Sequence, residues 1–438
     1  MPLTLSSAPG STAPLAPTSI RQLSQEDAAH LLRRTSFGAT PAEIEALVGR
    51  TPTQAAEALM TYPQTLEASN FDPLSAVNAG AAGKLIQAAW MWEMLYTPYP
   101  LRERLALVWS NHFVVANDKV RNVHALQDYL ALLRGHGLGR FSEFALSVAR
   151  SPAMLHYLDN DQNRKGKPNE NFSRELLELF TAGIGTPDQP NYTEKDVREG
   201  ARGLTGWSFQ GGRNQVKDFA EQPRFVALPK QHDDGSKTYL GKAGNFTPED
   251  IVRMAAAHPA TPTRIAGKLW AAFVSSTPDP AGIAALAQTF QSSGGELRTV
   301  MHSLLTSDAF YGEANRLSLY RSPVEYVVGA VRAMGRPNLG EKAVLGLVGT
   351  TARMGQELLH PPTVKGWDGG REWINDSALL LRMQAAAALT LGNNAPKGET
   401  LTPLSTLGKA DGLNRALSGL NDKQRAYLML ISPEYQLI

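Results

Sequence analysis

Helix-start signals recur along the chain, and they constrain its fold more than any other feature. Ser24 with Asp27, and Thr193 with Asp196, have the spacing of a capping box, in which two side chains satisfy free backbone amides at a helix start. Thr40 precedes a proline, the residue favoured at the first helical position. Between such signals, apolar residues recur at the helical period. The sequence therefore predicts a mainly α protein, a multi-helix globular array.

A single region interrupts the predicted helices. Residues 225–228 and 238–240 flank Asp234-Gly235, a pattern that predicts a β-hairpin. We expect the surrounding region, about 208–246, to be a small insertion that behaves as a mobile lid or an exposed lobe. The rest of 20–438 is predicted to be one large α-helical domain, with helical period over 82–97, 100–116, 122–134, 141–157, 170–182, 193–204, 248–258, 261–274, 281–292, 294–306, 322–334, 341–357 and 376–390.

Composition excludes several classes of protein. Of the 438 residues, 42% are hydrophobic and 19% charged, which is an ordinary globular balance. The net charge is only +2 and no basic tract stands out, so nucleic acid is not an expected partner. The chain has no cysteine, which excludes disulfides, thiolate metal sites and a Cys nucleophile.

The sequence contains no segment typical of membrane insertion. No apolar run approaches the roughly 20 residues that span a bilayer, so we expect no integral membrane segment. Residues 1–19 are rich in Pro, Ser, Thr and Ala and lack the basic and apolar parts of a secretory signal. They predict a disordered leader.

The most informative stretch for function is 163–181. A polar turn leads into a predicted helix that carries Glu170, Asn171, Arg174, Glu175 and Glu178, with Phe172, Leu176, Leu179 and Phe180 on one face. Glu175 and Asn171 lie at the edge of the apolar face, where a half-buried carboxylate needs a partner. An alternative is a solvated ladder of ion pairs at i, i+4 spacing.

This stretch resembles the signature of the bacterial domain-of-unknown-function family numbered eighteen hundred. The resemblance runs from about residue 25 to the C-terminus, through matching segments at 30–41, 102–104, 109–113, 192–198, 204–207, 232–233 with Lys237, 321–325 and 361–367. It implies no established activity. Many members of that family resemble exported proteins encoded beside a sulfatase-like family, so the resemblance implies export and a sulfatase-like protein partner.

Two histidine positions are candidates for chemistry. His112 ends a predicted helix among aromatic residues, where it is either a hydrogen-bonded core residue or a general base or metal ligand. His232 and Asp233 stand on the predicted hairpin with Lys237, although Asp233 could simply form the turn. No paired-histidine helix motif supports zinc hydrolase chemistry. A composite metal site from His112, Glu175, His232 and Asp233 remains an alternative.

Other residues suggest ligand binding. The loop 360–375 carries His360, Lys365, Trp367 and Trp373, and tryptophan faces suit sugar rings or cations. The alternative is a loop that covers the core with its tryptophans as plugs. Arg174 and Arg321 could clamp a carboxylate, sulfate or phosphate, or could form ordinary ion pairs. Ser322-Pro323 after Arg321 is a helix start.

Our first hypothesis is an acid–base enzyme, a hydrolase or lyase of glycoside-type chemistry that acts on a polar, carbohydrate-like or anionic substrate. Glu175 would be the acid or base, opposite His112 or Asp233, with His232 and Glu170 as further catalytic candidates. Substrate would be bound by Arg174, Asn171, Lys237, Arg321, His360, Lys365, Trp207, Trp367 and Trp373. This hypothesis predicts that His112, Glu175, His232 and Lys365 surround one cavity.

A second hypothesis is a non-catalytic binding or scaffold partner of a sulfatase-like protein, in which the same polar segments join helices. A metal-dependent enzyme is a third. The sequence assigns no cofactor.

Overall fold

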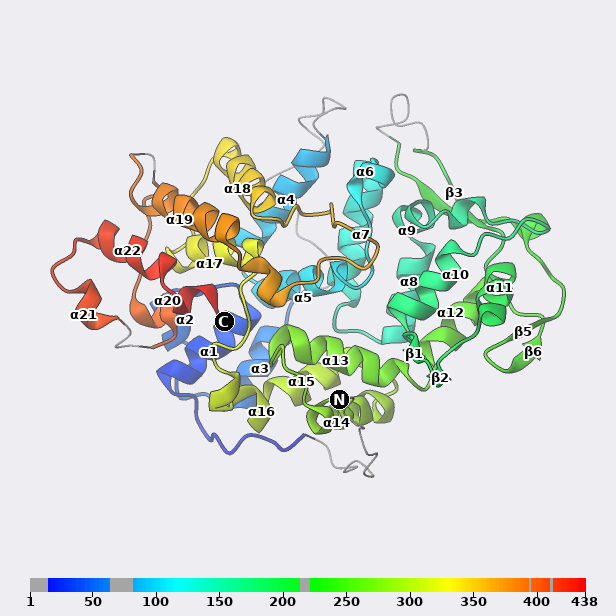
Figure 1. The fold of residues 1–438 in the computed structure, drawn as a ribbon, viewed down its shortest axis with the longest axis horizontal. Helices are drawn as coiled ribbons and strands as arrows, with labels where there is room; N and C mark the ends of the chain where they lie inside the picture. The colour runs from blue at the N-terminus through cyan, green and yellow to red at the C-terminus, as the bar shows by residue number, and fades with distance from the viewer. Residues whose placement is uncertain (1–14, 64–81, 213–220, 394, 410–412) are drawn as a thin grey trace.

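The computed structural model describes residues 15–63, 82–212, 221–393, 395–409 and 413–438. Within these ranges the protein is mainly helical, as predicted, with three two-stranded antiparallel sheets. Helices surround α5 (Pro100–Ser110) near the centre of the molecule (Figure 1). The N-terminal half contributes α1 (Gln25–Thr35), α2 (Pro41–Glu45), α3 (Pro52–Met60), α4 (Ala82–Tyr96), α6 (Asn117–Val120), α7 (Val123–His136), α8 (Phe141–Arg150), α9 (Pro152–Tyr157), α10 (Asn171–Glu175) and α11 (Glu194–Gly203).

The second half completes the array. Its helices are α12 (Pro248–Ala256), α13 (Thr261–Phe273), α14 (Pro280–Ser292), α15 (Leu297–Leu305), α16 (Asp308–Tyr311), α17 (Pro323–Ala333), α18 (Glu341–Arg353), α19 (Asp376–Thr390), α20 (Pro403–Leu407), α21 (Asn414–Leu417) and α22 (Asp422–Ile431). Among the closest packings are α13 on α14, α4 on α18, α8 on α12 and α5 on α7. None of the described helices is long and apolar enough to cross a membrane.

The predicted helix starts are confirmed. Ser24, Thr40, Thr193 and Ser322 each cap a helix, and each forms a full capping box with the third helical residue. The predicted helix over 141–157 is two helices, because Pro152 has no amide to donate and begins α9 as its first residue.

The predicted small β-hairpin insertion is confirmed by β5 (Lys237–Tyr239) and β6 (Lys242–Gly244), but the predicted pairing around Asp234-Gly235 is wrong. β4 (Arg224–Ala227) pairs with β3 (Trp207–Gln210), with Trp207 opposite Ala227. β5 pairs with β6, and β1 (Gly185–Thr186) pairs with β2 (Gln189–Pro190). The Asp-Gly turn is instead tied to α11, since Asp233 accepts from Arg202 Nε at 2.8 Å and from the Gly235 amide at 3.0 Å. β4 and β5 therefore pair with other strands and not with each other.

Part of the region 208–246 is packed against the helical array. β5 packs on α11, and its Lys237 and Tyr239 are buried, at 1% and 0% exposed. Residues 213–220 lie outside the described residues. Motion of the rest of the region stays a prediction.

The disordered leader over residues 1–19 stays a prediction, and residues 1–14 of it lie outside the described residues. In the described part, the Thr18 amide donates to Thr306 O at 2.8 Å and the Asp308 amide donates to Ala16 O at 3.1 Å. These bonds attach the segment to α15 and α16.

Three consecutive charged residues lie in the core on α5. Arg102, Glu103 and Arg104 are 4%, 0% and 7% exposed. Glu103 accepts from Arg134 Nε at 2.7 Å, from Arg134 Nη2 at 2.8 Å and from Trp90 Nε1 at 3.1 Å. This carboxylate therefore joins α4, α5 and α7 through charge-assisted hydrogen bonds.

Glu103→Gln should destabilise the protein strongly. The substitution removes the only full negative charge that Arg134 contacts among the described residues, and an unpaired buried charge costs about 3–5 kcal/mol. Chemical denaturation at pH 7 measures the loss. Glu143→Gln is the matched control, because Glu143 and Arg253 form a half-exposed pair at 3.5 Å, worth at most about 1 kcal/mol. Equal losses in both variants would contradict the structural role of Glu103.

Candidate functional site

The helix predicted over 170–182 changes its winding after Glu175. α10 ends there and continues as a π-helix, Leu176–Phe180. Such a wide turn leaves carbonyl groups without their usual helical partners, and π-helices are frequent at functional sites. Arg264 Nε and Nη2 donate to Leu179 O at 3.1 and 2.9 Å, and Thr181 Oγ1 donates to Leu176 O at 2.6 Å. Side chains from other segments therefore hold the turn.

His112 is one of the residues that hold this turn. Its Nε2 lies 3.1 Å from Phe180 O, and a carbonyl only accepts, so Nε2 carries the proton. The ring is 2% exposed and packs among Trp109, Phe113 and Phe180. Burial, and then the charges of Lys268 and Arg264, hold the pKa of His112 well below its ordinary 6.5. This geometry favours the core-residue interpretation of His112 over a general base.

Two carboxylates lie near each other at this junction, Glu175 at the end of α10 and Glu178 in the π-helix. Burial, and then the charge of Glu178, raise the pKa of Glu175, whereas Lys365 and Arg174 act in the opposite direction. Glu178 accepts from the Tyr192 hydroxyl at 3.4 Å and lies 3.8 Å from Lys365 Nζ. The upward shift in the pKa of Glu175 fits an acid–base role.

Arg174 and Glu170 form a surface network. Arg174 donates to both oxygens of Glu194 at 2.7 and 2.9 Å and to Glu170 at 3.2 Å. These hydrogen bonds raise the pKa of Arg174. The arrangement fits the ion-pair alternative. The guanidinium of Arg174, which was predicted to bind a substrate anion, is instead bonded to Glu194 and Glu170. Asn171 is partly buried at the start of α10, where its amide donates to Asn169 Oδ1 at 3.0 Å.

His232, Asp233 and Lys237 form a separate cluster with α11. His232 Nδ1 donates to Thr205 O at 3.0 Å, and Lys237 Nζ donates to the carbonyls of Asp233 and Gly235. The hydrogen bonds to Arg202 lower the pKa of Asp233. The turn alternative accounts for these contacts.

The predicted convergence on one cavity is therefore wrong for three of its four members, because Glu175, like His112 and His232, is not among the residues that line the cavity of Lys365. Lys365 lines a cavity that neither His112 nor His232 lines. His112 is held in the core by the π-helix, and His232 is held against α11.

Three further candidates lie away from that cavity. Trp207 is 2% exposed, and the Arg150 guanidinium lies 5.4 Å from its ring centroid. Arg321 is 1% exposed and donates to Phe37 O at 2.8 Å. His360 is exposed at the start of the loop.

The cavity itself has a volume of about 480 Å³ and lies where the loop 360–375 meets α5 and α13. The segment between α18 and α19 crosses the centre of the molecule near α5 (Figure 1). Lys365, Trp367 and Trp373 line the cavity from the loop, so three of the predicted binding residues do converge. Apolar walls come from Leu107, Val108, Ala271, Ala272 and Leu319, and further polar groups from Asn111, Ser276, Gln356 and Asp368.

Asn111 fixes the loop over this cavity. Its Oδ1 accepts from the Trp367 amide at 2.7 Å, and its Nδ2 donates to Trp367 O at 3.0 Å. Gly366 has φ +88°, and a Cβ there would overlap Asn111 Oδ1. Only glycine allows this close approach. The loop is thus held by paired hydrogen bonds and not only by its tryptophans.

The cavity wall also holds a buried ion pair, Arg104 Nη2 to Glu325 Oε1 at 2.6 Å. Arg34 lies close enough to Arg104, Glu325 and Arg321 for their charges to shift its pKa. One carboxylate therefore faces three guanidinium groups. The balance of charge behind this wall is positive.

Lys268, on α13, lines the same cavity and was missed in the sequence. Burial, and then the charge of Arg264, lower the pKa of Lys268 from its ordinary 10.5 to about 8. Within the described part of the chain, no hydrogen bond or ion pair reaches its Nζ. Arg264 lies four residues before it, and like charges at this spacing destabilise a helix. Two positive charges four residues apart on one predicted helix were the feature of the sequence that could have pointed to Lys268.

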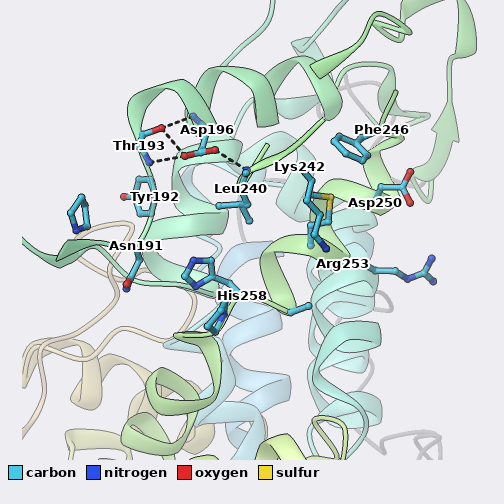
Figure 2. A pocket seen from close by; sticks show the side chains of 15 residues that line it. Asn191, Tyr192, Thr193, Asp196, Leu240, Lys242, Phe246, Asp250, Arg253 and His258 are labelled. Carbon is cyan, nitrogen blue, oxygen red and sulfur yellow. Dashed lines mark hydrogen bonds between the residues drawn. The ribbon is translucent and has the colours of Figure 1, made fainter. Parts of the chain in front are cut away.

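A second cavity, of about 870 Å³, lies between α11, α12 and the β5–β6 hairpin. Figure 2 shows Tyr192, Leu240, Lys242 and His258 around it. Asp196 is already engaged there, since it accepts from Thr193 and from the Leu240 amide. His258 Nδ1 accepts from the Ala260 amide at 3.1 Å. Among the described residues, no group of three or more His, Asp or Glu side chains could hold a metal ion.

The family model described as "Protein of unknown function (DUF1800)" matches residues 30–437. The chain belongs to this family. The resemblance of the 163–181 stretch and of the other segments is thereby confirmed. No curated protein and no solved structure matches this DUF1800 chain.

His112→Phe should flatten the acid side of the stability profile of this DUF1800 protein. The folded pKa of His112 is depressed, so below about pH 6.5 only the unfolded chain takes up the proton, and stability is lost as pH falls. Phe removes that loss, although it also removes the bond to Phe180 O, worth about 1 kcal/mol at pH 7. Denaturant unfolding at pH 7 and pH 5 compares the slopes. His360→Phe, at an exposed position, should retain the wild-type slope, and a wild-type slope in His112→Phe would contradict the assignment.

Glu175→Gln and Glu178→Gln should have different effects on the thermal stability of the protein. The folded pKa of Glu175 is raised, so above its ordinary value of 4.5 its negative charge opposes folding, and a neutral amide should maintain or raise the melting temperature at pH 7. Glu178→Gln weakens the contacts with Tyr192 and Lys365 and should cost about 0.5–1 kcal/mol. Paired thermal melts test this. A larger loss in Glu175→Gln would mean that Glu175 is a structural ion-pair partner.

Proposed function

We propose that this DUF1800 protein is an acid–base enzyme that binds an anionic, sugar-like small molecule in the 480 Å³ cavity under the loop 360–375. One observation carries the proposal. Lys268 lines this cavity, and no hydrogen bond or ion pair joins its Nζ to the described residues. A partly buried amine without a partner is costly unless a ligand supplies one.

The charge around the cavity supports an anionic ligand. Lys268 and Lys365 both line it, and Lys365 is the more exposed, with its side chain 64% accessible. Glu325 is already paired with Arg104, and Asp368 is exposed at the rim. A carboxylate that enters between the two lysines would gain charge-assisted hydrogen bonds.

The shape of the cavity supports a sugar-like ligand. Trp367 and Trp373 line it beside polar groups, and aromatic faces pack well against the apolar face of a sugar ring. The volume lies within the range of small-molecule sites, about 300–1,000 Å³.

The perturbed acidities support acid–base chemistry. The pKa of Glu175 is raised and that of Lys268 is lowered, and groups shifted toward neutrality from opposite sides are typical of acid–base sites. Lys365 connects the two, since it lines the cavity and contacts Glu178 beside Glu175. Lys268 is thus a candidate base in the cavity, and Glu175 is a candidate acid on the helix whose Glu178 contacts Lys365.

A second candidate function, a non-catalytic partner of a sulfatase-like protein, is favoured by a different observation. Four of the five exposed large hydrophobic residues in the described ranges, Leu379, Leu380, Met383 and Leu391, lie on α19 or directly after it. Exposed apolar groups that cluster on one element are typical of protein interfaces. The two candidates need different residues, Lys268 for the first and Leu380 for the second.

Methyl glucuronoside should bind the protein more tightly than methyl glucoside, which has the same ring without the carboxylate. Lys268→Met should weaken binding of the glucuronoside about tenfold, since a hydrogen bond to a charged group contributes about 1.5 kcal/mol or more. Isothermal titration calorimetry measures both ligands. Lys242→Met, in the second cavity, is the matched control. Equal affinity for the two sugars, or equal weakening by both substitutions, would reject this site.

A further inference from the structure

The amine of Lys268 is placed for covalent chemistry. It lines a cavity whose walls include Leu107, Val108 and Ala272, so its surroundings are partly apolar. Among the described residues, no carboxylate neutralises it by an ion pair. A lysine in such a pocket keeps a larger fraction of its amine unprotonated and nucleophilic near neutral pH.

Arg264 is held beside this amine by the π-helix. Both Nε and Nη2 of Arg264 donate to Leu179 O, so the guanidinium is fixed by two bonds to one carbonyl. Arg264 precedes Lys268 by about one turn of α13, and its positive charge disfavours protonation of the lysine. A second cation beside a nucleophilic lysine is a recognised way to activate it. The π-helix thus holds Arg264 at a position from which its charge lowers the pKa of Lys268.

We propose that Lys268 is a catalytic amine that forms an imine with an anionic substrate bearing an aldehyde or keto group. This inference rests on the proposed function, because it uses the same cavity and the same anionic ligand. The lone pair of Nζ attacks the carbonyl carbon and forms the C–N bond. The carbonyl oxygen leaves as water and takes both amine hydrogens with it, so the step needs no oxidant or reductant. Two classes of substrate carry both a reactive carbonyl group and a carboxylate: open-chain hexuronates and 2-oxo acids.

Reductive trapping tests the proposal with the full-length chain. The protein is incubated at pH 7.5, a value chosen at roughly the folded pKa of the amine, with glucuronate or with pyruvate, in the presence of cyanoborohydride. Intact mass and peptide mapping then locate the reduced adduct. We expect one adduct per chain, at Lys268, with at least one of the two probes. The probe that reacts distinguishes a sugar aldehyde from a 2-oxo acid.

Two variants make the result specific. Lys268→Arg keeps the positive charge without a nucleophilic amine, and it should abolish the adduct. Lys242→Arg alters a lysine of the second cavity and should leave the adduct at Lys268. No adduct with either probe, or adducts spread equally over Lys268, Lys365 and Lys242, would overturn the proposal.

Binding of methyl glucuronoside separates this inference from the proposed function. That ligand has no free carbonyl, so it reports the anion site alone. If it binds the wild-type chain and no adduct forms, the imine is rejected and the proposed function stands. If neither binding nor adduct is found, both are rejected.

Discussion

The arrangement of the molecule depends on charge buried at its centre. α5 carries Arg102, Glu103 and Arg104 in succession, and all three lie in the core. Consecutive residues of a helix point in different directions, so burying all three requires neighbours on several sides of α5. Glu103 meets Arg134 of α7 and Trp90 of α4, and Arg104 meets Glu325 of α17. Ion pairs of this kind specify which helices meet, because a wrong neighbour would leave a buried charge unpaired.

The same buried charge forms the inner wall of the candidate site. Arg104 and Glu325 line the cavity, and Arg34 and Arg321 lie behind them. These arginines also bind carbonyl groups of other segments, since Arg104 donates to Arg34 O and Ala272 O and Arg321 donates to Phe37 O. The core of this DUF1800 protein thus serves two purposes with one set of residues. It fixes the helices, and it gives the cavity a positive background.

The π-helix after Glu175 links this scaffold to the cavity. The π-helix ends at Phe180, and the carbonyls of its last two residues, Leu179 and Phe180, accept from Arg264 and His112. Arg264 then acts on Lys268, and Glu178 of the π-helix contacts Lys365. The π-helix therefore contacts Lys365 directly through Glu178, and it is linked to Lys268 through Arg264. The last carbonyls of a helix have no partners within the helix, so Arg264 and His112 supply the donors that this helix end needs.

The sequence by itself determined what local chemistry controls. Capping boxes and prolines act within a few residues, so the helix starts at Ser24, Thr40, Thr193 and Ser322 could be read directly, and with them the mainly α fold. The loop 360–375 was also recognisable as a binding candidate, because its tryptophans and lysine are adjacent in the chain. Only the tertiary structure decided the rest. The end of the π-helix is bonded to side chains 68 and 85 residues away, and β4 pairs with β3 across residues that no local turn signal joins. Lys268 became a site residue only when α13 was placed beside the loop. Contacts between distant segments leave no periodic pattern in one sequence, because each depends on where the whole chain places its partner.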